Sequence, residues 1–175
     1  MATKPRPATR PANFVSNGWN IWFHRLFRER FATLVAEVEA LAQKNPKNYQ
    51  HERSAKLLAA LVDIIEKRVP SNPDAAEFRL GRTLGPFTNW RRVKRNGLPD
   101  RYRLFFQFRS SVKVIVFVWL NDEDTLRKRD AKTDVYAVFR KMLESGEVPN
   151  EFNQLLTKAA ATPGPWGKGG SKQTS

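Results

Sequence analysis

Apolar residues in the first third of the chain recur at three- and four-residue steps, which is the spacing of an amphipathic helix. The first such pattern runs over residues 27–42 and ends at Asn45-Pro46, because the residue before a proline avoids helical backbone angles. A second pattern covers residues 49–68 and stops at the segment 69–73, which contains two prolines. We expect the two helices to form an αα-hairpin.

Beyond residue 76 the apolar pattern shortens into strand-like segments separated by turn residues. We expect a short strand within residues 77–84. Residues 89–95 and 101–109 predict the two arms of a hairpin around the turn 96–100. The run 112–120 lacks polar alternation, which indicates a central strand buried on both faces.

A last helix is predicted after the acidic segment 121–124. Thr133 or Asp134 can cap its N-terminus, and Gly146 falls near its end. Two helices, then an antiparallel meander, then a helix is the order of an α+β protein.

The composition is that of a folded protein with a strongly basic surface. Its 175 residues include 31 Lys and Arg against 17 Asp and Glu, for a net charge of +14, and 41% are hydrophobic. Nucleic acid is therefore the leading partner class, ahead of an acidic protein and of an anionic membrane surface. We expect one domain at 16–160, a disordered basic tail at 1–15 and a flexible tail at 161–175. For the first tail, a solvated role is favoured over a nucleic-acid-binding arm.

Cysteine is absent, which excludes disulfides, thiolate metal sites and a cysteine nucleophile, and is typical of the reducing cytosol. No apolar run is long enough to span a bilayer, and the N-terminal segment has no apolar core of a secretory signal. We expect a cytoplasmic protein without a membrane partner.

The positive charge is concentrated in the predicted hairpin. Residues 88–109 hold seven Lys and Arg and a single acid, a local charge of +6. Strand alternation places Arg92, Lys94 and Arg103 on one side, where they predict a cationic ledge. A merely solvated face is the simpler interpretation, but such a face more often mixes charges of both signs. The opposite side is apolar and is expected to pack on the helices; it consists of Tyr102, Leu104, Phe106 and Phe108.

Other titratable residues give weaker signals. His24 lies in an aromatic segment and His51 near a helix start, so both are interpreted as structural or surface residues. The acids at 122–124 are adjacent and point in different directions, which favours a strand-ending turn over a cation site. No P-loop, dinucleotide-binding glycine motif or Ser/His/Asp arrangement is readable, and we expect neither a metal nor a cofactor.

More cations follow the predicted buried strand, at Arg127, Arg129 and Lys132. Tyr136 falls on the first turn of the last helix and brings an ionisable hydroxyl. It can serve a site or be an ordinary half-buried helix aromatic, and the pattern favours neither interpretation.

Several segments between residues 16 and 155 resemble the YhaV family of type II toxin–antitoxin toxins, which belongs to the RelE/ParE superfamily. The resemblance implies a RelE-like fold, an antiparallel sheet with an N-terminal helical hairpin and a C-terminal helix. It also implies an endoribonuclease (mRNA interferase) that a PrlF-type antitoxin with an AbrB-like fold holds inactive. The segments are NGW (17–19), LVAEVEAL (34–41), NYQ (48–50), FRLGRTLG (78–85), WRRVK (90–94), RYRLFF (101–106), KVIVFVWLNDEDTLR (113–127) and KTDVYAVFRKML (132–143).

The same resemblance implies site residues. RelE-like enzymes carry a basic pair at alternate strand positions, an arginine in a Tyr-Arg-Leu strand and a tyrosine on the last helix. These features fall on the catalytic candidates Arg92, Lys94, Arg103 and Tyr136. The neighbouring cations are candidates for RNA binding, namely Arg91, Arg95, Arg101, Arg127, Arg129 and Lys132.

The chemistry that suits these residues is metal-independent transesterification, in which the ribose 2′-OH attacks the adjacent phosphorus. Arginines can stabilise the charge that develops on the phosphorane. Lys94 is a candidate base, and Tyr136 a candidate acid or a platform for base stacking. The predicted partners are the antitoxin, RNA on or off the ribosome, and operator DNA only as a toxin–antitoxin complex. The alternative is a non-enzymatic toxin or regulator that binds a protein target or DNA through the same basic face.

Overall fold

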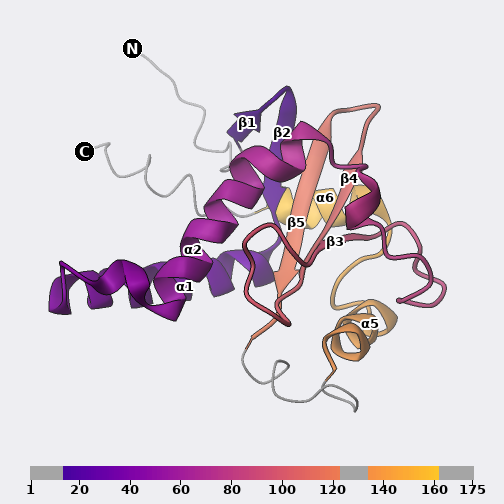
Figure 1. Ribbon diagram of the computed structural model, residues 1–175. Helices are drawn as coiled ribbons and strands as arrows, with labels where there is room; N and C mark the ends of the chain where they lie inside the picture. Colours follow the sequence, from indigo (N-terminus) through magenta and orange to yellow (C-terminus); the bar gives the residue numbers. More distant parts are fainter. Residues whose placement is uncertain (1–13, 123–133, 162–175) are drawn as a thin grey trace.

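A five-stranded sheet of order β1-β2-β5-β4-β3 forms the middle of the computed structural model, which describes residues 14–122 and 134–161 (Figure 1). Helices pack on both of its faces, so the protein is α+β, as the sequence predicts. The strands are β1 (Phe14–Ser16), β2 (Trp19–Phe23), β3 (Arg91–Val93), β4 (Leu104–Arg109) and β5 (Val114–Leu120).

The sheet is mixed, and the predicted antiparallel sheet is wrong in one pair. β2 runs parallel to β5, with Ile21 opposite Ile115, whereas the other neighbouring strands are antiparallel. Neither β1 nor β2 is predicted from the sequence. A parallel partner must be reached through a long crossover, so no local turn signal announces the pairing.

Strand β5 is buried at all seven positions, which confirms its predicted central place. The predicted hairpin arms are present but shorter, because β3 spans Arg91–Val93 and β4 begins at Leu104. The segment predicted to hold a short strand, 77–84, contributes only an isolated bridge from Arg79 to Arg91.

Helix α1 ends at the predicted asparagine, with Asn45 as its C-cap. α5 begins at the predicted cap Asp134 and ends at Gly146, which has the left-handed φ of +85°. The helices are α1 (Arg25–Lys44), α2 (Arg53–Asp63), α3 (Val69–Ser71), α5 (Val135–Ser145) and α6 (Phe152–Ala160), with short helical turns η1 (Tyr49–His51), η2 (Ile64–Arg68) and η3 (Ala76–Phe78).

The second helical segment ends at Ser71, within the predicted stop at 69–73 but three residues beyond the predicted last helical residue, 68. It widens into a π-helical turn, η2, in which the N–H of Val69 bonds to the carbonyl of Ile64. Pro70 then falls inside α3, where it has no N–H to donate. The carbonyl of Glu66, four residues earlier, instead accepts a hydrogen bond of 2.6 Å from the hydroxyl of Ser16.

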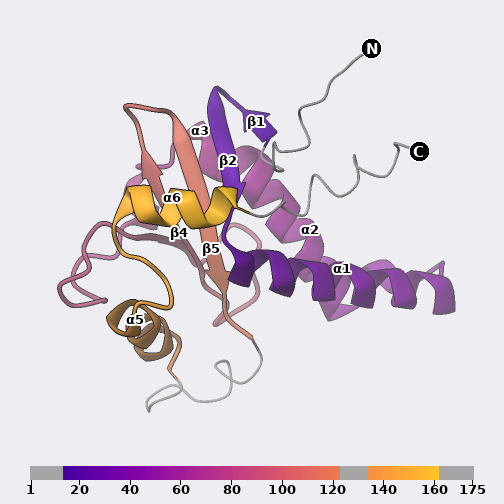
Figure 2. The same ribbon diagram turned by 180° about the vertical axis from the view of Figure 1, so that it is seen from behind.

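α6 is the main helix absent from the sequence-based prediction, so the predicted last helix, α5, is followed by another. Its N-cap, Glu151, accepts the N–H groups of Asn153 and Gln154. α6 crosses one face of the sheet, and α2 lies over the other (Figure 2). α6 spans nine residues and buries Phe152, Leu155 and Ala159, which recur at three- and four-residue steps, so its helical spacing is readable in the sequence.

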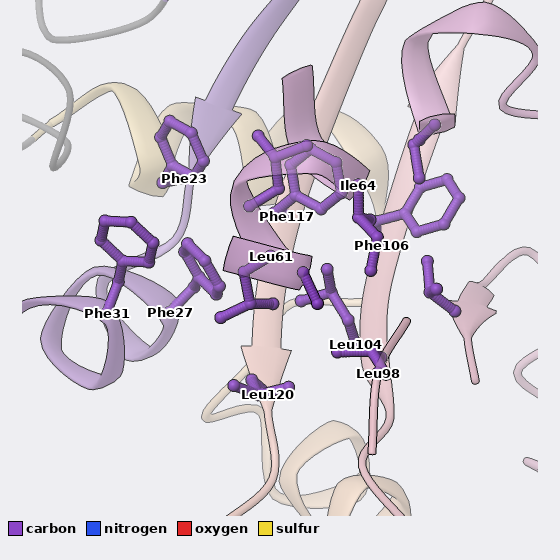
Figure 3. Packing of buried hydrophobic residues seen from close by; sticks show 14 of the residues in the cluster. Phe23, Phe27, Phe31, Leu61, Ile64, Leu98, Leu104, Phe106, Phe117 and Leu120 are labelled. Carbon is purple, nitrogen blue, oxygen red and sulfur yellow. The ribbon is translucent and has the colours of Figure 1, made fainter. Parts of the chain in front are cut away.

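Two apolar clusters fill the space on either side of the sheet. The first joins α1 and α2 to one face of β2, β4 and β5, and includes Phe23, Leu61, Phe106 and Phe117 (Figure 3). The second joins α5 and α6 to the other face. It contains Phe105, Trp119, Phe139, Phe152 and Leu155. No helix among the described residues is long and apolar enough to cross a membrane.

His24 is a buried N-cap, in agreement with its predicted structural role. Its Nδ1 accepts the N–H of Leu26 at 3.1 Å, and the residue is only 3% exposed. Burial, followed by the neighbouring charges Arg25, Lys158 and Arg28, lowers the pKa of His24 from 6.5 to about 4.

This pKa predicts that the protein loses stability in mild acid. The unfolded chain takes up a proton near pH 6.5 and the folded one only near pH 4. The contribution of His24 to the free energy of unfolding is therefore constant above about pH 6.5. It falls as the pH drops toward 4, by at most about 3 kcal/mol. Urea unfolding of wild type and His24→Asn across this range measures the effect, because asparagine still caps the helix but does not titrate. The matched control is His51→Asn at an exposed histidine; an equal pH slope in wild type and His24→Asn would contradict the assignment.

Candidate active site

Two arginines, one on β3 and one next to the start of β4, donate to the same phenol oxygen. Nε of Arg92, on β3, lies 3.0 Å from Oη of Tyr136, and Nε of Arg103, directly before β4, lies 2.9 Å from it. In both hydrogen bonds the phenol oxygen accepts, through one of its lone pairs. The O–H hydrogen of Tyr136 is therefore left to donate to a third group.

Tyr136 is held in place from two directions. The carboxylate of Asp134 caps α5 by accepting the N–H of Tyr136 at 3.2 Å. The tyrosine ring meets Phe105 edge-on, with ring centroids 5.9 Å apart. Phe105 in turn stacks on Phe139 at 4.2 Å and on Trp119 at 5.8 Å. The Tyr136 side chain is thus held against a packed group of aromatic rings, formed by Phe105, Phe139 and Trp119.

A shift in strand pairing places Trp119 in this aromatic group. The register of β4 against β5 changes between Phe105 and Phe106. As a result, the consecutive residues Val118 and Trp119 both belong to the cluster on the α5 side of the sheet. Such a bulge lets two consecutive side chains, here Val118 and Trp119, lie on the same face of the sheet, whereas regular alternation would put them on opposite faces.

Arg92 is fixed almost completely by the protein. Its Nη1 donates to the backbone carbonyls of Glu77 at 3.4 Å and Arg79 at 3.2 Å, and the residue is only 9% exposed. The sequence predicts an open cationic ledge, and this is wrong for most of that face. α5 and α6 cover it, because its apolar residues Trp90 and Phe105 need burial as much as those of the opposite face.

Arg103 is oriented by a residue that the sequence does not single out. The fully buried Asn121 accepts the N–H of Arg103 through Oδ1 at 2.7 Å and donates through Nδ2 to the carbonyl of Arg101 at 3.0 Å. Arg101 has a φ of +72°, which side-chain-bearing residues rarely adopt. A polar residue directly after a buried strand is the signal that could have identified Asn121.

A pocket of about 380 Å³ opens beside Arg92. Lys94 and Arg95 line it together with Arg92 and the segment 76–79. Within the described ranges, the side chain of Lys94 has no hydrogen bond or ion pair. The structure therefore places Lys94 beside Arg92 without engaging it elsewhere.

The other predicted RNA-binding residues are less closely gathered. Arg91 turns away from Arg92, pairs with Asp74 at 3.0 Å and lies 5.3 Å from the ring centre of Phe108. The Arg91 hydrogen bond is the main cause that lowers the pKa of Asp74. Arg101 is exposed, and its backbone carbonyl accepts a hydrogen bond from the side chain of Asn121. Three candidates lie outside the described residues, namely Arg127, Arg129 and Lys132.

The histidines and acids add no site in the described part of the chain. His24 is a helix cap, and His51 is exposed on η1. Among residues 14–122 and 134–161, no group of three or more His, Asp or Glu is placed to hold a metal ion. Of the acids at 122–124, only Asp122 lies within the described residues.

Comparisons with known proteins agree with the resemblance in the sequence. Residues 21–160 match the YhaV toxin family, described as "toxin with endonuclease activity, of toxin-antitoxin system". The ribonuclease toxin YhaV of Escherichia coli strain K12 is 44% identical over 148 residues, which cover 83% of this chain and 95% of the relative. Toxin YhaV of Escherichia coli O6:H1 is 46% identical over 141 residues, which cover 79% and 90%. No solved structure matches.

Proposed function

The chain belongs to the YhaV family of toxin–antitoxin toxins with endonuclease activity, and on that premise we propose that it cleaves messenger RNA by metal-independent transesterification and so inhibits translation. The observation that carries this proposal is the phenol oxygen of Tyr136, which accepts hydrogen bonds from Arg92 and Arg103. Arg92 also lines the pocket that holds Lys94 and Arg95. The ribonuclease name of the relative from strain K12 supports RNA as the substrate.

In the proposed reaction the RNA supplies its own nucleophile. The 2′-oxygen forms a bond to phosphorus, the bond from phosphorus to the 5′-oxygen breaks, and the products are a 2′,3′-cyclic phosphate and a 5′-hydroxyl. Arg92 and Arg103 donate to the non-bridging oxygens, on which negative charge builds up in the phosphorane. We assign Lys94, which lines the pocket, to receive the proton of the 2′-hydroxyl on its neutral amine.

For Tyr136 we propose proton donation to the leaving 5′-oxygen in preference to base stacking. Its oxygen already accepts from two guanidinium groups, so its hydrogen is free to be donated. Its ring is less suited to stack on a base, because one edge contact goes to Phe105 and the guanidinium of Arg103 lies 6.0 Å from the ring centre.

The proposal extends to fold and partners. We propose a RelE-like arrangement for the sheet and its helices, and a PrlF-type antitoxin as the inhibitor. An acidic antitoxin segment would suit a toxin with a net charge of +14. Operator DNA is bound only by the toxin–antitoxin complex in this scheme, and the toxin acts in the cytoplasm.

The proposed function predicts RNA cleavage that resists chelation. Purified protein incubated with single-stranded RNA in EDTA should produce fragments that end in 2′,3′-cyclic phosphate. Reactions run with and without ribosomes show whether cleavage needs them. The ends are identified by mass spectrometry of the fragments.

A negative result has a clear meaning. If EDTA abolishes cleavage and Mg²⁺ restores it, the metal-independent mechanism is wrong. If no RNA is cut under any condition, ribosomes included, the protein is better explained as a toxin that binds a protein target or DNA through its basic face.

A further inference from the structure

A second basic hollow shares the lining residue Arg79 with the pocket beside Arg92, which is the catalytic pocket of the proposed function. It has a volume of about 660 Å³ and is formed by the loop that leads into β3. The loop supplies Arg79 and Arg82, and β3 supplies Arg91. Among the residues that the structure describes, Asp74 is the one acid that lines it, so three positive charges face one negative charge.

The arginines of this hollow differ in what already binds them. Arg79 and Arg91 share the carboxylate of Asp74, at 3.4 and 3.0 Å. Arg82 is exposed, and within the described residues its side chain has no hydrogen bond or ion pair. Arg82 is therefore the cation of this hollow that is available to a ligand.

The loop that carries Arg82 is held in place by buried residues and backbone hydrogen bonds. Leu80 and Leu84, on either side of it, are 7% and 0% exposed and belong to the cluster under α5. Backbone bonds across the turn, from Gly85 to Arg82 and from Thr83 to Leu80, close the loop. Gly85 has a φ of +64°, and the guanidinium of Arg140 lies where its side chain would be. The turn is thus packed from both sides.

Arg79 lines both hollows: its carbonyl accepts from Arg92, and its guanidinium pairs with Asp74. On the other side of Arg79 are Arg92 and Lys94 of the catalytic pocket. A single strand of RNA places phosphates at regular intervals along its backbone. A strand whose scissile phosphate lies beside Arg92 can therefore extend past Arg79 to Arg82.

We propose that Arg82, with Arg79, forms a second phosphate-binding subsite that takes the backbone phosphate next to the scissile one. The subsite rests on the proposed function and adds to it a direction for the RNA, from the catalytic pocket across the loop before β3. Its ligand is a single-stranded RNA backbone, recognised by charge and hydrogen bonds and not by base.

The test measures binding of a short 2′-O-methyl RNA, which cannot be cleaved, across the cut site that wild type shows on unmodified RNA. Arg82→Ala should weaken binding about tenfold, the effect of losing one charge-assisted hydrogen bond. It should also reduce the slope of log affinity against log salt by about 0.7. The control is Arg53→Ala, at an exposed arginine at the start of α2 without a side-chain partner in the described structure.

Neutral methylphosphonates placed one at a time in this RNA locate the contact. The losses of binding free energy caused by Arg82→Ala and by the methylphosphonate next to the cut should not add, because both remove the same contact. The losses caused by Arg82→Ala and by a methylphosphonate at the cut should add fully. Binding by Arg82→Ala equal to that of Arg53→Ala, or coupling at the cut itself, would overturn the subsite and leave the proposed function standing. Wild type that neither cuts nor binds RNA would overturn both.

Discussion

Arg103→Ala should reduce RNA cleavage to a small residual rate while the protein stays folded. The substitution removes a guanidinium that donates to Tyr136 and, in the proposed reaction, to the phosphorane. Loss of one such donor costs about 10²–10³ in rate. The measurement is single-turnover cleavage of RNA at saturating enzyme, together with growth of cells that express the variant.

The fold should survive because the backbone of residue 103 keeps its anchor. Asn121 binds the N–H of Arg103 and the carbonyl of Arg101, and neither bond uses the arginine side chain. Far-UV circular dichroism and the urea midpoint check this, with Arg53→Ala as the matched arginine control. A folded Arg103→Ala protein that cleaves at the wild-type rate would remove this residue from the site.

Tyr136→Phe should have the second large effect, and its cause can be identified by chemistry. The variant keeps the ring against Phe105 but removes the oxygen to which Arg92 and Arg103 donate. Loss of a general acid costs about 10²–10⁴ in rate. Cleavage of an RNA with an ordinary 5′-oxygen leaving group should fall by this factor.

A substrate with sulfur in place of that 5′-oxygen separates proton donation from positioning. A thiolate leaves without being protonated, so the deficit of Tyr136→Phe should nearly vanish on this substrate. Arg103→Ala should stay slow on it, because the phosphorane charge still needs its donor. Equal losses of Tyr136→Phe on both substrates would show that the phenol orients the two arginines and does not donate a proton.

The elements that the sequence predicts well are those whose signals are local. Helix α1 and its end at Asn45 follow from a periodic apolar face and the Asn-Pro pair. The capping of α5 by Asp134 and its end at Gly146 follow from residue types at its two ends. β5 follows from an unbroken apolar run. Each pattern lies within a few residues of the backbone that it shapes.

What the sequence misses depends on partners that are distant along the chain. β2 becomes a strand because β5, more than ninety residues later, pairs with it in parallel. The helical segment runs past Pro70 to Ser71, and the carbonyl that the proline leaves open accepts the hydroxyl of Ser16, 50 positions earlier in the chain. Neither event has a signature near the residues that it changes.

The candidate site divides in the same way. Residue types and strand alternation by themselves determined that Arg92, Lys94 and Arg103 belong to one side of a basic hairpin, and the family resemblance added Tyr136. Only the tertiary structure decided that this side is covered by α5 and α6, that Asn121 holds Arg103, and that two Nε atoms meet one phenol oxygen. The physical reason is that alternation sets the direction of a side chain along its own strand, whereas hydrogen bonds between residues 33 and 44 positions apart depend on how the layers pack.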